Sequence, residues 1–484
     1  MSHSSLSSVY PKIPGRRTRE IKKTIFYEYF DKKVRSSCLK MKVKVLSRNP
    51  DEYLRETKRD IHKIPRNFDP SLHPFQAARE YTKALNAVKL EKVFAKPFIG
   101  NLEGHRDAVS CICKHPSQLS TILSGAYDGE VRTWSLSLGT CTRAFLAHDG
   151  IVRGIAYMPD GKHFITVSDD KTIKTWDVIS ADEDGEPVNT IVNKTVLTGI
   201  THHRANPTFV TCGEGICQMW EDTRNEPLRT FKWGVDSLLD IKFNPIQKDL
   251  LASCASDRSI ILYDTRETGP LTRIIMKLRS NKLSWNPMEA FIFTCANEDY
   301  NLYTYDTRKM KTPVNVHMDH VEAVIDVDYS PTGREFVSGS YDKSIRIFEA
   351  NKGHSREVYH TRRMHRLTCV GWSLDNKFVI SGSDEMNLRI WKAKASEKLG
   401  ILRARERNAL LVNDALKEKY AAHPEVRRIA RHRQVPKHIY NARAELRTIR
   451  EKSKRKEANR RYHSKKGTIP FVSERQKNVV AHES

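Results

Sequence analysis

The feature that most constrains the fold of this 484-residue chain is a short unit that recurs seven times along its middle. Each copy has an acidic residue, five intervening residues and a closing aromatic residue, and successive aromatics lie 42 to 44 residues apart. Short apolar runs separated by turn residues fill the intervals, which predicts four short strands per unit. The copies are Asp128–Trp134, Asp170–Trp176, Glu214–Trp220, Asp257–Tyr263, Asp299–Tyr305, Asp342–Phe348 and Glu385–Trp391.

The repeat resembles that of WD-repeat β-propellers, in which every copy forms one four-stranded blade. Gly104-His105 and Trp176-Asp177 are the fullest matches to the two dipeptides that characterise such repeats. The resemblance covers residues 101–396 and implies an all-β fold, a seven-bladed WD-repeat β-propeller. A basic, mainly helical C-terminal extension is expected to follow it.

A propeller also needs a strand that closes its ring. In WD proteins a strand from before the first repeat completes the last blade, which protects the sheet edges. The chain is expected to turn helical soon after Trp391, so no later strand is available. The apolar stretch Val93–Leu102 is therefore the expected ring-closing strand, and the propeller is expected to span residues 93–396.

WD blades contain a buried hydrogen-bond chain in which a His contacts a turn Asp and a Ser or Thr, and this hydroxyl reaches the Trp indole. Buried polar groups need partners, so the chain should stiffen a blade. A His near an Asp and a Ser also occurs in hydrolytic triads, but recurrence in several repeats favours a structural role. The expected members are His105, Ser124, Asp128 and Trp134 in the first repeat and His148, Thr166, Asp170 and Trp176 in the second.

The positive charge is confined to the two ends of the sequence. Lys and Arg exceed Asp and Glu by 25, but residues 101–396 carry a net charge of −2, whereas 1–40 carry +7, 41–100 carry +6 and 397–484 carry +14. Such an excess indicates a polyanionic partner, either nucleic acid or an anionic membrane surface. A membrane is disfavoured because the basic segments lack Trp- and Phe-rich apolar faces and no long apolar run occurs.

The flanks divide into three segments. Residues 1–40 begin with a serine-rich stretch and are expected to be a basic, disordered extension, and residues 41–92 form an N-terminal arm. Residues 397–484 form a basic helical tail. Its first helix is expected at 397–422, and its second runs from Lys437 to Arg461 by apolar periodicity.

Two dense basic clusters lie in this tail. Each predicts a nuclear localisation signal or an RNA-phosphate contact, with a solvated helix face as the alternative. Few aromatics separate the basic residues, which favours backbone recognition of structured RNA over stacking on single-stranded bases. The candidate residues are Arg427, Arg428, Arg431, Arg433, Lys452, Lys454, Arg455, Lys456, Arg460 and Arg461.

Several short motifs make the resemblance more specific. Together with the basic tail they are similar to the Sof (suppressor of fibrillarin) family of nucleolar WD-repeat proteins. The resemblance covers residues 41–484. The motifs are Met41–Leu46, Asn286–Phe291, Asn297–Tyr303, Ser383–Asn387 and the tail segment Arg428–Pro436.

The Sof resemblance implies a component of the small-subunit processome, a nucleolar assembly that processes precursor ribosomal RNA. Family members act there as scaffolds, which implies no catalytic residue, cofactor, metal or small-molecule substrate. The implied partners are precursor ribosomal RNA, small nucleolar RNA and other processome proteins, and the implied location is the nucleolus within the nucleus. No membrane partner is implied.

A second activity implied by the family is that of a substrate receptor in a cullin-RING ubiquitin ligase. Propellers with this role often end a repeat with a WDxR-type box, whose Arg contacts the ligase adaptor. Two segments match with Tyr in place of Trp, and the alternative is that each Arg pairs with a nearby carboxylate. The candidate contacts are Asp264, Arg266, Asp306 and Arg308.

An enzyme is the third class of protein that such a sequence could encode. The sequence contains no P-loop, no nucleophile elbow and no zinc-ligand spacing. The pair His202-His203 has no Cys or carboxylate at ligand spacing, which favours a structural or surface role. The sequence therefore predicts a non-catalytic protein.

Overall fold

The computed structural model describes residues 69–178 and 185–483. The chain divides into two compact units, Met1–Pro74 and Phe75–Ser484, and the fold described below is that of the second. The expectation for residues 1–40 lies outside the described residues, as does most of the N-terminal arm.

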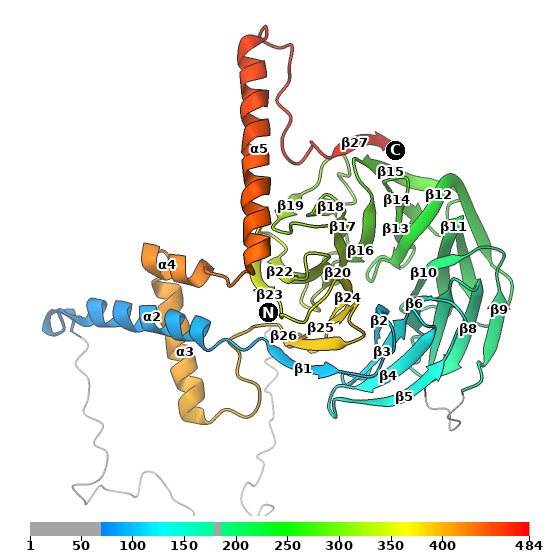
Figure 1. Ribbon diagram of the computed structural model, residues 1–484, viewed down its shortest axis with the longest axis horizontal. Coiled ribbons are helices and arrows are strands. Elements are labelled where there is room, and N and C mark those ends of the chain that lie inside the picture. The colour runs from blue at the N-terminus through cyan, green and yellow to red at the C-terminus, as the bar shows by residue number, and fades with distance from the viewer. Residues whose placement is uncertain (1–68, 179–184, 484) are drawn as a thin grey trace, which may run out of the picture. The chain divides into compact units, whose positions relative to one another are not determined.

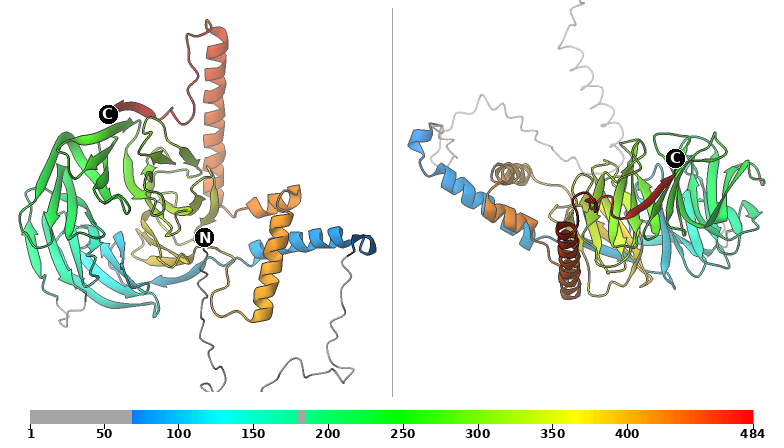
Figure 2. Two further views of the ribbon diagram at one scale, coloured as in Figure 1. Left: turned by 180° about the vertical axis from the view of Figure 1, so that it is seen from behind. Right: turned by 90° about the horizontal axis from the view of Figure 1, so that it is seen from above.

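Seven antiparallel blades follow one another around a ring, which confirms the propeller expected from the repeat (Figures 1 and 2). Blade 1 consists of β2 (Val109–Lys114), β3 (Thr121–Ala126), β4 (Glu130–Ser135) and β5 (Thr140–Leu146), and blade 2 of β6 (Val152–Tyr157), β7 (His163–Ser168), β8 (Thr172–Asp177) and β9 (Asn189–Val192). Blade 5 consists of β16 (Ser280–Trp285), β17 (Ile292–Asn297), β18 (Asn301–Asp306) and β19 (Asn315–Met318), and blade 6 of β20 (Val324–Tyr329), β21 (Glu335–Ser340), β22 (Ile345–Glu349) and β23 (Ser355–Tyr359).

Blades 3 and 4 share one strand. The long strand β11 folds back on itself near Gly215, which has a φ of +66°. The fold-back brings Trp220 Nε1 to within 2.9 Å of Thr211 Oγ1, to which it donates. Strand β12 pairs first with β11 and then with β13, so it leads directly from one blade into the next. The strands are β10 (Leu197–His202), β11 (Thr208–Glu221), β12 (Arg229–Phe243), β13 (Leu250–Ala255), β14 (Ser259–Asp264) and β15 (Pro270–Met276).

A strand from before the first repeat completes blade 7. Strand β1 (Phe98–Leu102) pairs antiparallel with β26 (Leu388–Lys392), next to β25 (Phe378–Ser383) and β24 (Leu367–Trp372). The strand begins at Phe98 instead of Val93. Helix α2 extends to Val93, and Pro97, which has no N–H to donate to a ladder, directly precedes the strand.

The apolar core lies between the blades. Each of the seven clusters of buried side chains in the described residues combines residues from two neighbouring blades. Where the ring closes, Leu102 of β1 packs with Val109 and Trp134 of blade 1 and Ile380 of blade 7. Each blade therefore depends on both neighbours for its apolar burial.

Polar side chains on the innermost strands bridge successive blades. Each sits near the start of an inner strand and donates to a backbone carbonyl of the next inner strand. The last of these bonds joins blade 7 back to blade 1. The bonds are Ser110 Oγ to Val152 O, Thr198 Oγ1 to Leu238 O (2.5 Å), Asn281 Nδ2 to Val324 O (2.8 Å) and Thr368 Oγ1 to Val109 O.

Four α-helices, one further strand and a short 3-10 helix at the end of the first unit complete the described chain. The first tail helix, expected at 397–422, spans residues 404–419, and Pro424 begins the next helix because proline fits the first turn of a helix. None of the described helices is long and apolar enough to cross a membrane. The elements are η2 (Pro70–Leu72), α2 (Gln76–Val93), α3 (Ala404–Lys419), α4 (Pro424–Arg431), α5 (Lys437–His463) and β27 (Val479–Glu483).

Shortening the buried side chain of the ring-closing strand should destabilise the whole propeller. Leu102 is fully buried between blades 7 and 1, so Leu102→Ala should lower the free energy of unfolding by about 2–5 kcal/mol. Chemical denaturation measures this change. The matched variant Ile99→Ala removes an exposed side chain of the same strand and should cost far less; equal losses from the two variants would contradict the proposed closure.

Candidate nucleic-acid interface and adaptor-binding residues

The expected buried hydrogen-bond chain is complete in blade 2. His148 Nδ1 lies 2.8 Å from Asp170 Oδ2, and its Nε2 lies 2.7 Å from Thr166 Oγ1. Trp176 Nε1 donates to the same hydroxyl at 2.9 Å. Every member is satisfied within the blade, and Thr166 is fully buried. The hydroxyl is therefore committed to structure and unavailable as a nucleophile.

Blade 1 departs from the expected arrangement at its acidic member. His105 Nε2 lies 2.6 Å from Ser124 Oγ, which also accepts from Trp134 Nε1 at 2.7 Å. Asp128, however, accepts from the backbone N–H of Glu130 and does not bond His105. Glu130 faces the imidazole at 3.7 Å instead. Burial, together with nearby Arg132, lowers the pKa of His105 to about 4, so the ring is neutral at pH 7.

The adaptor candidates lie on neighbouring blades 4 and 5: Asp264 and Asp306 end β14 and β18, and Arg266 and Arg308 follow two residues later. Arg266 pairs with Asp264 and with Asp249, each at 3.2 Å. Arg308 pairs with Asp306 at 2.8 Å and lies over the ring of Phe291, 4.5 Å from its centroid. Each arginine thus pairs with a nearby carboxylate, which is the alternative to adaptor binding. The two arginine side chains nevertheless remain 72% and 64% exposed.

Helix α2 from the N-terminal arm packs with the C-terminal helices (Figure 2). Lys417 of α3 bonds Glu91 at 2.8 Å, and Tyr81 lies 4.3 Å, centroid to centroid, from His423. Ala84 and Val88 are the buried residues of α2. The arm and the tail, which the sequence separates by the whole propeller, therefore form one helical module.

A buried carboxylate joins the tail to the propeller. Asp319 lies between β19 and blade 6, and its side chain has no solvent exposure. It accepts from the backbone N–H and the hydroxyl of Ser355 at 2.8 and 2.7 Å. Arg433 Nη1 and Arg443 Nη2, both from the tail, each donate to it at 3.0 Å. Its partners thus come from β23, from the segment before α5 and from α5 itself.

The charges around Asp319 exceed what one carboxylate neutralises. Burial opposes its ionisation, but Arg346, the bonds from Ser355 and Arg443 outweigh burial and hold the pKa of Asp319 well below its ordinary value. Arg346 is fully buried 4.0 Å away, and His354 lies 3.1 Å from the carboxylate. This site is a structural anchor that the sequence did not single out.

Arg433, which the sequence predicts to contact RNA or to belong to a nuclear localisation signal, is engaged within the protein. Its guanidinium bonds Asp319 and Ser355, and its side chain is only 20% exposed. The basic run around Arg433 indicates a cationic surface, but Arg433 itself pairs with the buried carboxylate of Asp319. Charge pattern alone does not reveal such a partner.

The other basic candidates lie at the surface of α4 and α5. Two of them contact the chain's own C-terminal segment: Lys454 lies 3.4 Å from Glu474, and Arg461 is half-buried with its guanidinium over the ring of Phe471. The exposed members are Arg427, Arg428, Arg431, Lys452, Lys454, Arg455, Lys456 and Arg460.

The end of the chain returns to the propeller as a fifth strand of blade 4. Strand β27 pairs antiparallel with β15, with Ile274 opposite His482 and Ile275 opposite Ala481. Just before it, Asn478 Nδ2 donates to Asp299 Oδ2 at 2.8 Å. The tail is therefore fixed at two places, the Asp319 anchor and the edge of blade 4.

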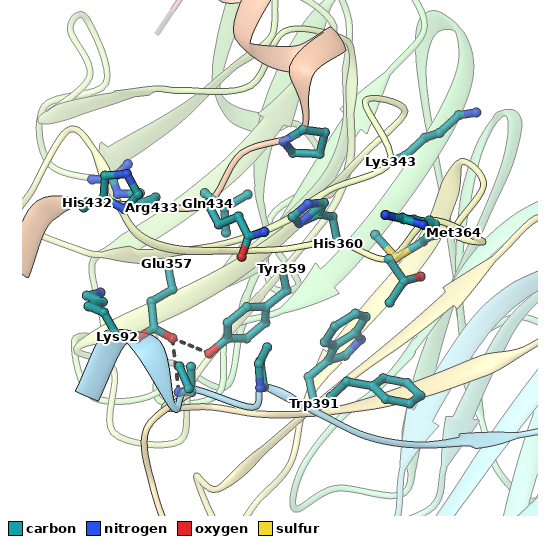
Figure 3. Close-up of a pocket in the computed structure, with 18 of the residues that line it drawn as sticks. Lys92, Lys343, Glu357, Tyr359, His360, Met364, Trp391, His432, Arg433 and Gln434 are labelled. Atoms are coloured by element: carbon teal, nitrogen blue, oxygen red, sulfur yellow. Dashed lines mark hydrogen bonds between the residues drawn. The ribbon is translucent and has the colours of Figure 1, made fainter. Parts of the chain in front are cut away.

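A cleft of about 960 Å³ lies between β23, the end of α2 and the segment that joins α4 to α5 (Figure 3). Its two carboxylates are already paired: Glu91 with Lys417, and Glu357 with Arg356 and Tyr359. Its remaining titratable groups are basic. These are Lys92, Lys343, Arg362, His360, His365, His432 and His438, together with the anchored Arg433. The cleft can accept an anionic group.

Within the described ranges, no group of three His, Cys, Asp or Glu residues is placed to hold a metal ion. The pair His202-His203 serves local structure: His202 Nε2 bonds Asp222 at 3.0 Å, and His203 Nδ1 accepts from the N–H groups of Ala205 and Asn206.

Comparison with known proteins places the tail and the repeats in described families. A Sof1-like domain matches residues 393–479, and WD domain G-beta repeats match 96–135, 139–177, 311–349 and 355–392.

The chain is also similar to curated proteins over nearly their whole length. It is 60% identical to a zebrafish protein (Danio rerio) and 57% identical to a human protein, both called DDB1- and CUL4-associated factor 13; each match covers 91% of this chain and 99% of the relative. Protein SOF1 of Saccharomyces cerevisiae is 44% identical, over 91% of this chain and 94% of its own. The crystal structure of the WD40 β-propeller domain of Doa1 matches 61% of this chain and 96% of its own, with a TM-score of 0.54 at 16% identity.

Removing the anchor charge should loosen the tail. Asp319→Asn keeps the shape of the side chain but leaves Arg433 and Arg443 without their counter-charge and removes one of the two carboxylates that face Arg346. Loss of one partner from a buried ion cluster costs about 3–5 kcal/mol, so limited trypsin digestion should cleave the tail faster and Tm should fall. Glu349→Gln, which breaks the exposed pair with Lys352, is the control, with an effect below about 1 kcal/mol. Unchanged cleavage of the Asp319 variant would disprove the anchor.

Proposed function

The chain belongs to the Sof1-like family of WD-repeat proteins, and from this premise we propose that it is a non-catalytic scaffold of the small-subunit processome. In this role it takes part in nucleolar processing of precursor ribosomal RNA and in small-subunit biogenesis. The proposed partners are precursor ribosomal RNA, small nucleolar RNA and other processome proteins.

One observation supports this proposal above the others. The tail, residues 397–484, carries a net charge of +14 and is covered by the Sof1-like match up to residue 479. Asp319 holds the start of its helix α5 against a nearly neutral propeller. A flexible basic tail would pay an entropic cost for every contact it makes with RNA. A tail fixed on a rigid ring presents its cations in place, which suits a scaffold that organises folded RNA.

The propeller fits the protein-binding half of this role. Its net charge of −2 over residues 101–396 gives no general attraction for phosphates. Its His–hydroxyl–Trp chains are buried and closed by the Trp donor in blades 1 and 2, which supports the proposal that they are structural. Ring surfaces of this kind offer several separate faces to protein partners.

A second proposed role is that of substrate receptor in a cullin-RING ubiquitin ligase, alongside the first. Two relatives are named DDB1- and CUL4-associated factor 13. In this chain Arg266 and Arg308 stand on neighbouring blades, each largely exposed beside its own carboxylate. An adaptor surface with matching acidic groups could engage both guanidinium groups at once.

Crosslinking of the full chain to RNA in living cells tests the scaffold proposal. Sequencing of the bound RNA should recover precursor ribosomal RNA of the small subunit and a box C/D small nucleolar RNA. In vitro, affinity for a structured RNA should fall steeply with salt, with a slope of about −3 or steeper in log K against log salt, because several phosphates are neutralised. Recovery of ribosomal precursor no higher than with an unrelated propeller would refute the proposal.

Changing both adaptor candidates tests the ligase role separately. Arg266→Ala combined with Arg308→Ala should reduce adaptor pull-down about tenfold or more, since truncated interface arginines often cost over 1 kcal/mol each. Recovery of ribosomal precursor should stay as it is in the unaltered chain. Arg224→Ala removes another exposed arginine, paired with Glu221 on blade 3, and serves as the control. If the double variant captures as much adaptor as the control, these residues do not bind it.

A further inference from the structure

Helix α5 carries a row of cations that faces the propeller. Arg443, Arg447, Arg450 and Lys454 follow one another at intervals of four, three and four residues, which places them on one face of the helix. The helix begins beside β22 and β23 and runs past β19 (Figure 1). Only Lys454 of this row was among the residues expected from sequence to meet RNA.

This face and the rim of blades 5 and 6 enclose a groove of about 240 Å³. Its floor is apolar and consists of Met318 and Val321 from the propeller and Leu446 from the helix. Apolar floors of this kind support the methylene stems of long basic side chains while the charged heads stay at the opening. His354 stands on the opposite rim with a side chain that is 67% exposed.

The groove has more cations than its carboxylates neutralise. Asp319 is fully buried and already engaged by the anchor, and the other carboxylate, Glu451, pairs with Arg447 at 2.8 Å. Arg450 has a long contact of 3.5 Å to the amide oxygen of Asn301, and its charge partly opposes the rise that burial causes in the pKa of the nearby Asp299. A guanidinium with such a weak partner keeps its donors available for an incoming anion.

We infer that this groove binds the phosphate backbone of RNA, with Arg447, Arg450 and Lys454 on one wall and His354 on the other. The inference rests on the proposed function and names the surface through which the tail acts. The row from Arg443 to Lys454 spans about 16 Å at 1.5 Å per residue, long enough to follow successive phosphates of one strand. Arginine forks bind phosphate oxygens in pairs, as they also bind carboxylates. RNA is favoured as the occupant because the tail carries a net charge of +14 over residues 397–484, which suits a partner with a phosphate at every nucleotide.

The anchor makes this groove a prepared site. Arg443 belongs to the row and bonds Asp319 at 3.0 Å, so the first turn of the row is fixed to the rim. Further along the helix, Lys454 lies 3.4 Å from Glu474, in the segment that leads to β27. Ordering these side chains before RNA arrives lowers the entropic cost of binding.

Two matched pairs of variants in the tail test the inference in the full chain. Arg447→Gln with Arg450→Gln removes two groove cations. Arg405→Gln with Arg407→Gln, the outer pair, removes two exposed cations of helix α3 that do not line the groove. The measurement is fluorescence anisotropy of a labelled RNA hairpin between about 50 and 200 mM salt. The groove pair should reduce the salt slope by about 1.4–1.8, and the outer pair should leave it nearly unchanged.

Removing the groove carboxylate should act in the opposite direction. Glu451→Gln takes a negative charge from the groove and should tighten hairpin binding about two- to fivefold, the scale of one exposed charge pair. Glu445→Gln makes the same charge change two residues from Arg443 and Arg447, on the outer side, and is the control. Circular dichroism of each variant shows whether α5 remains folded.

The outcomes separate this inference from the proposed function. If the unaltered chain binds RNA but the groove and outer pairs weaken it equally, or neither does, the groove is not the site and the scaffold proposal stands. If the unaltered chain binds no RNA, the scaffold proposal fails and the inference fails with it. If labelled poly-glutamate binds in place of RNA and only the groove pair weakens it, the groove takes an acidic protein and the inference is overturned.

Discussion

A carboxylate that is sealed from water must find cations inside the protein, and Asp319 meets this requirement with residues that are distant in sequence. Its ion partners are Arg346 of the propeller and Arg433 and Arg443 of the tail. A buried charge without such partners would cost several kcal/mol. The tail is thus not a free appendage: its position beside blades 5 and 6 follows from the need to neutralise one buried ion.

This anchoring depends on the closed propeller ring, whose blades 5 and 6 carry Asp319 and its partners in the propeller. The ring is closed by the pairing of β1 with β26, by an apolar cluster at every blade junction and by side-chain bonds between successive inner strands. Loss of one junction would therefore be felt by both neighbouring blades. On this frame the tail is fixed at Asp319 and again where β27 extends blade 4. Helix α5 then has two distinct faces, one that lines a groove with the rim and one that is open to solvent.

The blades could be predicted because their determinants recur at a fixed spacing. Even blade 3, which lacks the His, keeps the bond between Trp220 and Thr211. The course of the tail could not be predicted. Asp319 stands directly before His320, where the first repeat has Gly104 before His105. An acidic residue in place of this glycine was the sequence feature that could have indicated the anchor. Arg433 and Lys452 look alike in the sequence, since only the folded propeller supplies a counter-charge to one of them. Strand β27 was missed because five residues at a chain end show no clear period.

The central claim is that the propeller rim and the tail form one RNA-binding surface, and peptide-level mapping tests it most directly. The full chain, bound to RNA and irradiated, would be digested and its nucleotide-modified peptides identified by mass spectrometry. Adducts should appear together on peptides from α5 around Arg450 and on the β23 peptide that contains His354. Adducts restricted to the propeller faces, or to the tail with none on the rim beside it, would contradict the account.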